Sequence, residues 1–161
     1  MLPINVSIQF KVSSYNDGDF MDRKYTCKGE GISPEITWSD LPTGTRSLAL
    51  IMEDPDAPIG TFTHWVVYNI APSITGLKEN MPKIPKLENG ITQGRGGLGR
   101  VGYIGPCPPG KKPHRYVFHF YATQLAPNLG EGLRKKELLK ILEGNVTGEA
   151  TFTLKYGRSE G

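Results

Sequence analysis

The sequence contains few of the residues with which small proteins build covalent or metal cross-links. Only two cysteines, Cys27 and Cys107, and three histidines occur among its 161 residues. The cysteines lie far apart and form no Cys-x-x-Cys pair, so the sequence predicts neither a disulfide framework nor a paired-cysteine metal site. Because a chain of this length buries about 70% of its unfolded surface, we expect it to fold without either.

Long apolar runs are also missing. No stretch approaches the roughly 20 residues needed to cross a bilayer, and the first ten residues lack the basic and apolar regions of a signal peptide. The net charge of +3 is small and dispersed, which argues against nucleic acid as a partner. We therefore expect a single domain over residues 1–161, located in the cytoplasm and without a transmembrane segment.

Short strand patterns dominate what is present, and most of the 20 glycines and 13 prolines fall between them. Polar and apolar residues alternate near both ends of the chain, and two central runs are rich in β-branched and aromatic residues. The only convincing helix pattern covers about 133–142. Together these patterns predict an all-β dominated chain that forms an antiparallel β-sandwich. The expected strands are Asn5–Phe10, Ser47–Met52, His64–Ile70, Tyr116–Ala122 and Thr147–Tyr156.

The segment Gly94–Gly99 matches the G-x-G-x-x-G fingerprint of dinucleotide-binding sites. That fingerprint must follow a strand and open a helix, and the residues that follow, through Gly105 and Pro106, cannot form one. We therefore reject a dinucleotide site. The interpretation that survives is a flexible lip, whose backbone N–H groups and Arg95 or Arg100 could meet an anion.

Catalytic sites and metal sites likewise have little support in the sequence. Zinc could take His64, His114 and an aspartate as ligands, but no close ligand spacing is present. No G-x-S-x-G elbow supports a serine triad. Cys107 could form a thiolate pair with a histidine, or serve equally well as a small wall residue between two prolines. We predict no catalytic residue, no metal and no cofactor.

Two proline-rich segments carry the strongest functional signal. Proline fixes the backbone and removes donors, which makes such loops stiff and leaves neighbouring N–H groups free. Imidazole, tyrosine (Tyr103 or Tyr116) and backbone donors together suit a phosphate or sulfate oxygen. Asp54 either orients a histidine or, with Asp56, only shapes a turn. The segments are Asp54-Pro55-Asp56-Ala57-Pro58 followed by His64-Trp65, and Gly102-Tyr103-Ile104-Gly105-Pro106-Cys107-Pro108-Pro109 followed by His114-Arg115-Tyr116.

These segments closely resemble the motifs of the phosphatidylethanolamine-binding protein family, and the intact Pro106–Pro109 run is similar to its prokaryotic branch. The resemblance covers nearly the whole chain and departs at Arg95–Gly99, where relatives often carry an asparagine. It implies a large antiparallel sheet packed on a smaller one, with one or two short helices near the C-terminal part. It also implies a small pocket for phosphate-like anions or phospholipid head groups. The pocket residues that it implies are Asp54, Asp56, His64, Gly105, Pro106, His114 and Tyr116.

Members of that family, which includes the Raf kinase inhibitor proteins, are described as head-group binders, kinase-cascade modulators and serine-protease inhibitors. The resemblance implies a cytoplasmic binding or regulatory protein rather than an enzyme, with a small phosphate-bearing ligand as partner. A serine-protease inhibitor is the alternative, with Lys83–Leu87 and 110–113 as candidate loops. A kinase-pathway modulator, a weak acid–base enzyme and a homodimer stay open as further interpretations.

Overall fold

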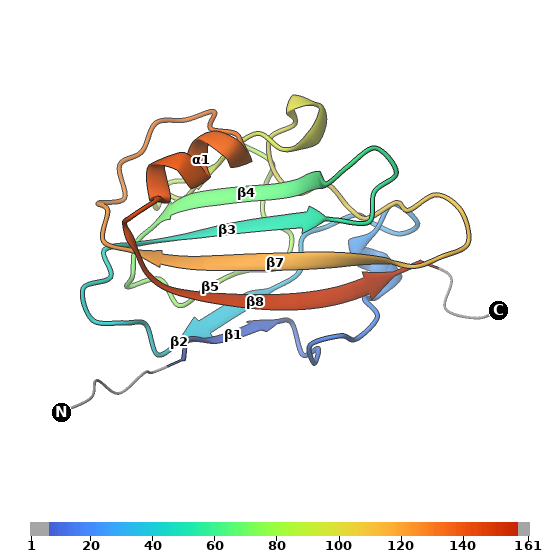
Figure 1. The fold of residues 1–161 in the computed structure, drawn as a ribbon, viewed down its shortest axis with the longest axis horizontal. Coiled ribbons are helices and arrows are strands. Elements are labelled where there is room, and N and C mark those ends of the chain that lie inside the picture. Colours follow the sequence, from blue (N-terminus) through green and yellow to red (C-terminus); the bar gives the residue numbers. More distant parts are fainter. Residues whose placement is uncertain (1–6, 158–161) are drawn as a thin grey trace.

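The computed structural model describes residues 7–157, which form two antiparallel sheets facing one another, one α-helix and two 3₁₀ turns (Figure 1). The small sheet has the order β1-β2-β5 and the large sheet β6-β4-β3-β7-β8. The predicted sandwich of a large and a small sheet is therefore confirmed. The elements are β1 (Gln9–Val12), η1 (Arg23–Tyr25), β2 (Ile36–Ser39), β3 (Ser47–Asp54), β4 (Phe62–Ile70), β5 (Gly76–Leu77), β6 (Thr92–Gln93), η2 (Gly97–Gly99), β7 (His114–Thr123), α1 (Lys135–Leu142) and β8 (Val146–Tyr156).

Aromatic side chains fill much of the space between the sheets. Phe10 of β1 stacks on Phe120 of β7 with ring centroids 4.8 Å apart, and Trp38 of β2 stacks on the same ring at 4.9 Å. On β8, Phe152 and Leu154 point to this core, as the alternation in the sequence predicts. The first expected strand, Asn5–Phe10, lies partly outside the described residues. Within the described residues, β1 begins at Gln9.

Strand β3 is buried on both faces, which explains its unbroken apolar sequence. Leu48 and Leu50 belong to the core between the sheets, whereas Ile51 packs on the outer face with Leu138 of α1. Burying such a side chain stabilises the fold by about 1.5–3 kcal/mol. The predicted helix is confirmed and begins at Lys135. Within residues 7–157 no helix is long and apolar enough to span a membrane.

The large sheet brings the two proline-rich segments to the same end of the molecule. β3 ends at Asp54, β4 begins at Phe62 and β7 begins at His114. Because β4 and β7 both run antiparallel to β3, the end of β3 lies between the beginnings of its two neighbours. The segments therefore meet at the right-hand end of the sheet in Figure 1.

A β-bulge determines which face of the sheet His64 occupies. Met52 pairs with Trp65 and Glu53 with Thr63, so His64 is an extra residue between the two pairs. Trp65 belongs to the core, and in a regular strand its neighbour would point to the opposite face. The bulge instead brings the His64 ring toward the core side, next to residues at the beginning of β7.

The structure contradicts the expectation that the chain has no disulfide. Cys27, in the loop after η1, is bonded to Cys107 across 80 residues of sequence. The Cys27 N–H also donates to the Pro106 carbonyl at 3.0 Å, so this loop is tied to the second proline-rich segment twice. The prediction was wrong because spacing along the chain does not show which distant residues the fold brings together. A thiolate at Cys107 is excluded while the bond is intact.

Candidate functional site

A pocket of about 230 Å³ lies where the two proline-rich segments meet. Its walls are mainly apolar, and the polar groups that reach it come from the end of β3 and the beginnings of β4 and β7. Five of the seven residues expected from the sequence line this pocket. Those five are Asp54, His64, Gly105, His114 and Tyr116.

His114 and Asp54 form a buried pair in the pocket. Nδ1 of His114 lies 2.6 Å from Oδ2 of Asp54, and both side chains are almost fully buried. A ring N–H donates to the carboxylate, which places a proton on Nδ1 and leaves Nε2 as the nitrogen available to a ligand. The second carboxylate oxygen accepts the backbone N–H of Asp56 at 2.8 Å. Asp54 is therefore placed to fix the orientation and tautomer of His114.

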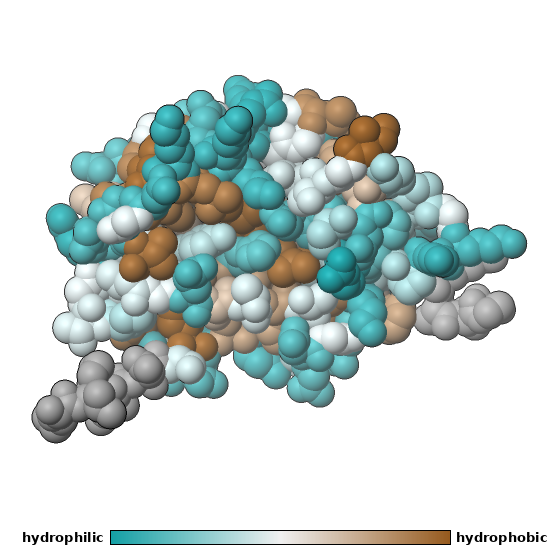
Figure 2. All heavy atoms as spheres, viewed as in Figure 1, coloured by the Kyte–Doolittle hydropathy of each residue, from teal (hydrophilic) through white to brown (hydrophobic). Residues whose placement is uncertain are grey.

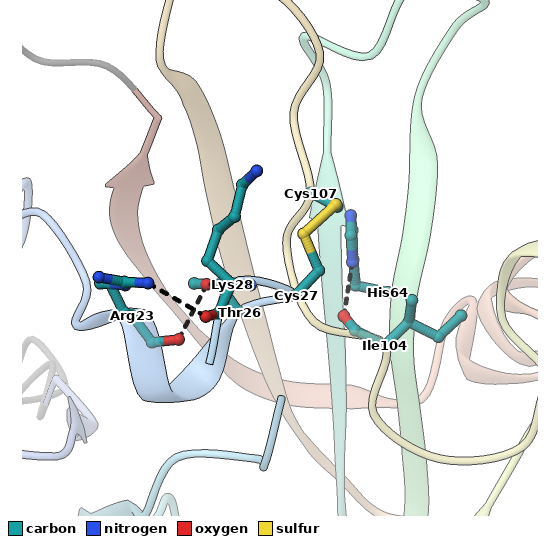
Figure 3. The surroundings of a disulfide bond; sticks show 7 residues. All are labelled: Arg23, Thr26, Cys27, Lys28, His64, Ile104 and Cys107. Carbon is teal, nitrogen blue, oxygen red and sulfur yellow. Dashed lines mark hydrogen bonds between the residues drawn. A yellow bond between two sulfur atoms is a disulfide. The ribbon is translucent and has the colours of Figure 1, made fainter. Parts of the chain in front are cut away.

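His64 is held in the same way, but by a backbone carbonyl. Its Nδ1 donates to the Ile104 oxygen at 2.6 Å, as Figure 3 shows. The ring packs edge-on against Phe62 and Tyr116, with centroid distances of 4.8 and 5.3 Å. Burial lowers the pKa of His64, and this effect outweighs the opposing influence of the Ile104 carbonyl and the Asp54 carboxylate. In the free pocket His64 is therefore neutral at neutral pH, with Nε2 left for a ligand.

The hydroxyl of Tyr116 is buried in the pocket wall without a partner. Within residues 7–157 it is the one buried side-chain nitrogen or oxygen that forms no hydrogen bond. Burial raises the pKa of Tyr116, and the nearby Asp54 carboxylate raises it further, so the hydroxyl keeps its proton. An unpaired buried hydroxyl costs about 1–3 kcal/mol. A ligand oxygen in the pocket would remove that cost.

The disulfide is part of the same pocket. Cys107 lines it together with Pro108 and Pro109, and Figure 3 shows the two sulfur atoms beside the His64 ring. Sequence reasoning missed this bond and also missed the pocket wall formed by Phe62. The aromatic residue two positions before His64 was the available signal. Among the described residues, no group of three or more His, Cys, Asp or Glu side chains is placed to hold a metal ion.

Two expected residues, Asp56 and Pro106, lie outside the pocket lining. Asp56 turns its carboxylate to Arg115, which donates from its backbone N, Nε and Nη2 at 2.8, 3.0 and 2.8 Å. These bonds lower the pKa of Asp56 to about 2. Its partner is a residue 59 positions away, which the turn sequence alone does not reveal.

Tyr103, the alternative to Tyr116 as a phenolic donor, is a buried residue of the hydrophobic core. Its hydroxyl donates to the Tyr25 carbonyl at 2.7 Å, and its ring packs edge-on against Trp65 at 5.4 Å. The ring is buried, and Tyr103 does not line the pocket. Of the two tyrosines, Tyr116 is the one placed to meet a ligand.

Comparisons with known proteins agree with this fold. The family described as phosphatidylethanolamine-binding protein matches this chain over residues 11–157. The chain belongs to the phosphatidylethanolamine-binding protein family. The resemblance noted in the two proline-rich segments is therefore confirmed, and both segments fall inside the matched residues.

Relatives in this family occur in archaea and bacteria. The UPF0098 protein of Methanothermobacter thermautotrophicus is 44% identical over 151 residues, which cover 94% of this chain and 99% of the relative. The UPF0098 protein of Aquifex aeolicus is 46% identical over 147 residues, covering 90% and 85%. The crystal structure of CT736 from Chlamydia trachomatis matches with a TM-score of 0.86 at 34% identity, covering 95% of this chain and 99% of the other. For E. coli YbcL, described as a member of the mammalian family, the TM-score is 0.85 at 31% identity, with 94% and 99% covered.

Proposed function

We propose that this chain is a binding protein whose pocket captures a phosphate-like anion, either free or as part of a phospholipid head group. The observation that carries the proposal is the buried, unpaired hydroxyl of Tyr116. The free ring nitrogens of His64 and His114 belong to the same small pocket. A phosphate group has several acceptor oxygens, which can accept from the Tyr116 hydroxyl and from each Nε2 once its ring is protonated.

The size and walls of the pocket support a small ligand. At about 230 Å³ it is smaller than the 300–1,000 Å³ typical of sites for drug-sized molecules. It therefore suits one phosphate group with a short substituent rather than a whole lipid. The apolar walls formed by Phe62 and the prolines keep water away, which strengthens charge-assisted hydrogen bonds inside.

Protonation of His64 is expected to accompany binding. Burial lowers the pKa of this histidine, so the free pocket holds it neutral. An anion beside the ring favours the imidazolium form, because opposite charges within about 4–6 Å stabilise each other. Anion capture should therefore take up a proton, with Nε2 of His64 donating to the bound oxygen.

We propose binding rather than catalysis for this pocket. A histidine oriented by an aspartate can perform acid–base chemistry, so His114 and Asp54 leave that alternative open. The nearby groups that could act as nucleophiles are poorly suited at neutral pH. Cys107 is held in the disulfide, and burial raises the pKa of Tyr116. Turnover of a phosphate ester that is lost in a His114→Ala variant would contradict this part of the proposal.

Serine-protease inhibition is a second candidate, supported by the loop Lys83–Leu87. The Ile84 side chain is 43% exposed. The side-chain amide of Gln93 donates to the Pro82 and Ile84 carbonyls at 2.7 and 3.0 Å, and the Gln93 N–H donates to the Pro85 carbonyl at 2.8 Å. A loop held by three such bonds loses little entropy when it docks to a protease. Inhibition that is lost in Ile84→Gly and retained in His64→Ala would favour this candidate.

A cytoplasmic location remains part of the proposal, and the disulfide makes it testable. Disulfides persist mainly in oxidising compartments, although intracellular proteins of hyperthermophiles also keep them. Alkylation of free thiols in lysed cells, before any oxidant is added, reports whether Cys27 and Cys107 are bonded in the cell. Finding the protein in the soluble cell interior supports the proposed location, and recovery only from an exported fraction contradicts it.

Calorimetry with phosphate and O-phosphorylethanolamine tests the main proposal. We expect the His64→Ala/His114→Ala variant to bind at least about tenfold more weakly than the native chain, because both ring nitrogens that reach the ligand are lost. His119→Ala is the matched control, since His119 does not line the pocket and faces Glu53 at 3.6 Å. Native affinity in the double variant would overturn the pocket assignment.

A further inference from the structure

Phe62 lines a second, larger hollow in addition to the pocket around His64, His114 and Tyr116, which we call the phosphate pocket after its proposed ligand. This hollow has a volume of about 710 Å³ and lies between the segment Gly94–Gly99 and the start of α1. Its cationic lining residues are Arg95, Arg134, Lys135 and Lys136, and none of its lining residues carries a carboxylate. We call it the basic cleft. Figure 2 shows hydrophilic side chains gathered over α1, which forms one side of this cleft.

Backbone pairing places two of these arginines next to each other. Arg95 and Arg134 form an isolated parallel β-bridge, and the Arg95 N–H donates to the Leu133 carbonyl at 2.9 Å. Side chains of like charge on directly paired residues repel each other and destabilise the pairing. The chain thus pairs the backbones of two cationic residues that both line the cleft, and a bound anion would offset the repulsion between their side chains.

Most of this positive charge is not neutralised inside the chain. Lys135 forms an ion pair with Glu53 at 2.5 Å. Within residues 7–157 no carboxylate oxygen lies within 4 Å of a charged nitrogen of Arg95, Arg134 or Lys136. Three cationic side chains in one hollow are therefore available to a ligand.

The wall opposite α1 is packed closely against the strand beneath it. A Cβ at Gly97 would collide with the Phe62 ring, which would have to move to admit a side chain there. A Cβ at Gly96 would lie 2.8 Å from the Thr63 carbonyl, closer than packed atoms approach. The arginine is held as well, since Nη1 of Arg95 donates to the Gly99 carbonyl at 3.0 Å. The expected lip therefore packs against β4 at Gly96 and Gly97 and presents Arg95 to the cleft.

We propose that the basic cleft binds a small anion carrying two or more phosphate groups, at a site separate from the phosphate pocket. Three available cations call for more than one negative group on the ligand, and a guanidinium can hold phosphate oxygens with two parallel hydrogen bonds. The volume of about 710 Å³ falls in the range of small-molecule sites and is well above that of the pocket. Phe62 and Leu139 add apolar surface for the body of such a ligand.

Binding of tripolyphosphate, pyrophosphate and orthophosphate to the native chain and to three variants tests this site. The cleft variant is Arg134→Gln/Lys136→Gln. The matched control is Lys11→Gln/Lys140→Gln, which removes the same charge from exposed positions outside the cleft lining. The third variant is His64→Ala/His114→Ala, which disables the phosphate pocket. Thermal unfolding of each variant verifies that it is folded before titration.

We expect the native chain to bind tripolyphosphate more tightly than orthophosphate. The cleft variant should lose at least about tenfold in tripolyphosphate affinity, whereas the control and histidine variants should stay within about twofold of the native affinity. The absence of tripolyphosphate binding by the native chain overturns the proposal. An equal loss in the Lys11→Gln/Lys140→Gln control also overturns it, because the attraction is then nonspecific. Loss confined to the histidine variant overturns it too, and assigns the anion to the pocket.

Discussion

Nδ1 of His114 lies 2.6 Å from Oδ2 of Asp54, although 60 residues separate them along the chain. This contact joins the beginning of β7 to the end of β3 and lies in the wall of the pocket proposed to bind phosphate. Both side chains are nearly inaccessible to water, so Nδ1 of His114 depends on Asp54 for its hydrogen bond. The pair links the stability of this end of the sheet to the orientation of His114, a proposed ligand-binding residue.

Asp54→Ala should destabilise the folded chain by about 3 kcal/mol, because it leaves His114 buried without its partner. Asp56→Ala should have a much smaller effect, since its ion pair with Arg115 is exposed to solvent. Chemical denaturation of both variants measures the difference. Equal losses of stability would show that the buried Asp54–His114 contact contributes no more to stability than the exposed Asp56–Arg115 ion pair.

Tyr116→Phe should raise the stability of the ligand-free chain while weakening anion binding. The substitution removes a buried hydroxyl that has no partner, and relieving such a group is worth about 1 kcal/mol or more. The same hydroxyl is a proposed donor to the ligand, so phosphate affinity should fall by about tenfold. Thermal unfolding with and without phosphate measures both effects. A variant that loses stability without ligand would indicate that the hydroxyl has a partner after all.

Removing the disulfide should lower the free energy of unfolding. Cross-linking two residues 80 positions apart restricts the unfolded chain by about 4 kcal/mol in the loop-entropy description. Cys27→Ser/Cys107→Ser should therefore unfold at lower denaturant than the oxidised chain, and reduced native chain should behave like the variant. Denaturation of the variant and of the native chain, with and without reductant, measures both differences. Identical curves for the oxidised and reduced chain would contradict this expectation.

Acid should weaken the fold through Glu53. The interaction with His119 and the ion pair with Lys135 lower the pKa of Glu53 to about 2. Its ordinary pKa is near 4.5, so the unfolded chain takes up this proton first as the pH falls. The stability from Glu53 is present above about pH 4.5 and is lost as the pH falls toward about 2. Glu53→Gln should flatten the stability curve in that window, and an unchanged slope would remove Glu53 as its source.

Sulfate binding should strengthen as the pH falls from about 8 to about 5.5, because sulfate keeps its charge there and a bound anion favours the protonated form of His64. Burial lowers the pKa of His64, so in the ligand-free chain this histidine carries no positive charge at neutral pH. The same shift means that His64 supports the fold above about pH 6.5 and that this support fades as the pH falls. Calorimetry in buffers of different ionisation enthalpy measures the expected proton uptake. Sulfate affinity that is constant with pH would contradict the role given to His64.

The sequence predicts those parts of the fold that depend on local patterns. The apolar run at Ser47–Met52 identifies a central strand because β3 is covered on both faces. Asp54, His64 and His114 could be nominated because each lies at a strand end beside rigid proline-rich backbone. The Cys27–Cys107 bond could not be found in this way, since nothing local marks the pairing.

Side-chain direction was the harder part of the site to predict. Asp56 stands two residues from Asp54 and looks equivalent in sequence, yet its carboxylate faces Arg115. His64 points to the pocket only because a bulge adds one residue to β4 opposite the Met52–Glu53 step. Such one-residue irregularities reverse the face of a side chain and depend on how neighbouring strands pair.

We propose above that His64 and His114 hold the anion, and NMR tests this directly. The chain has three histidines, so imidazole NMR signals report on each of them separately. During a phosphate titration, the signals of His64 and His114 should shift together with one dissociation constant, and those of His119 should stay in place. Shifts confined to His119, or none while phosphate binds, would contradict the assignment of the pocket.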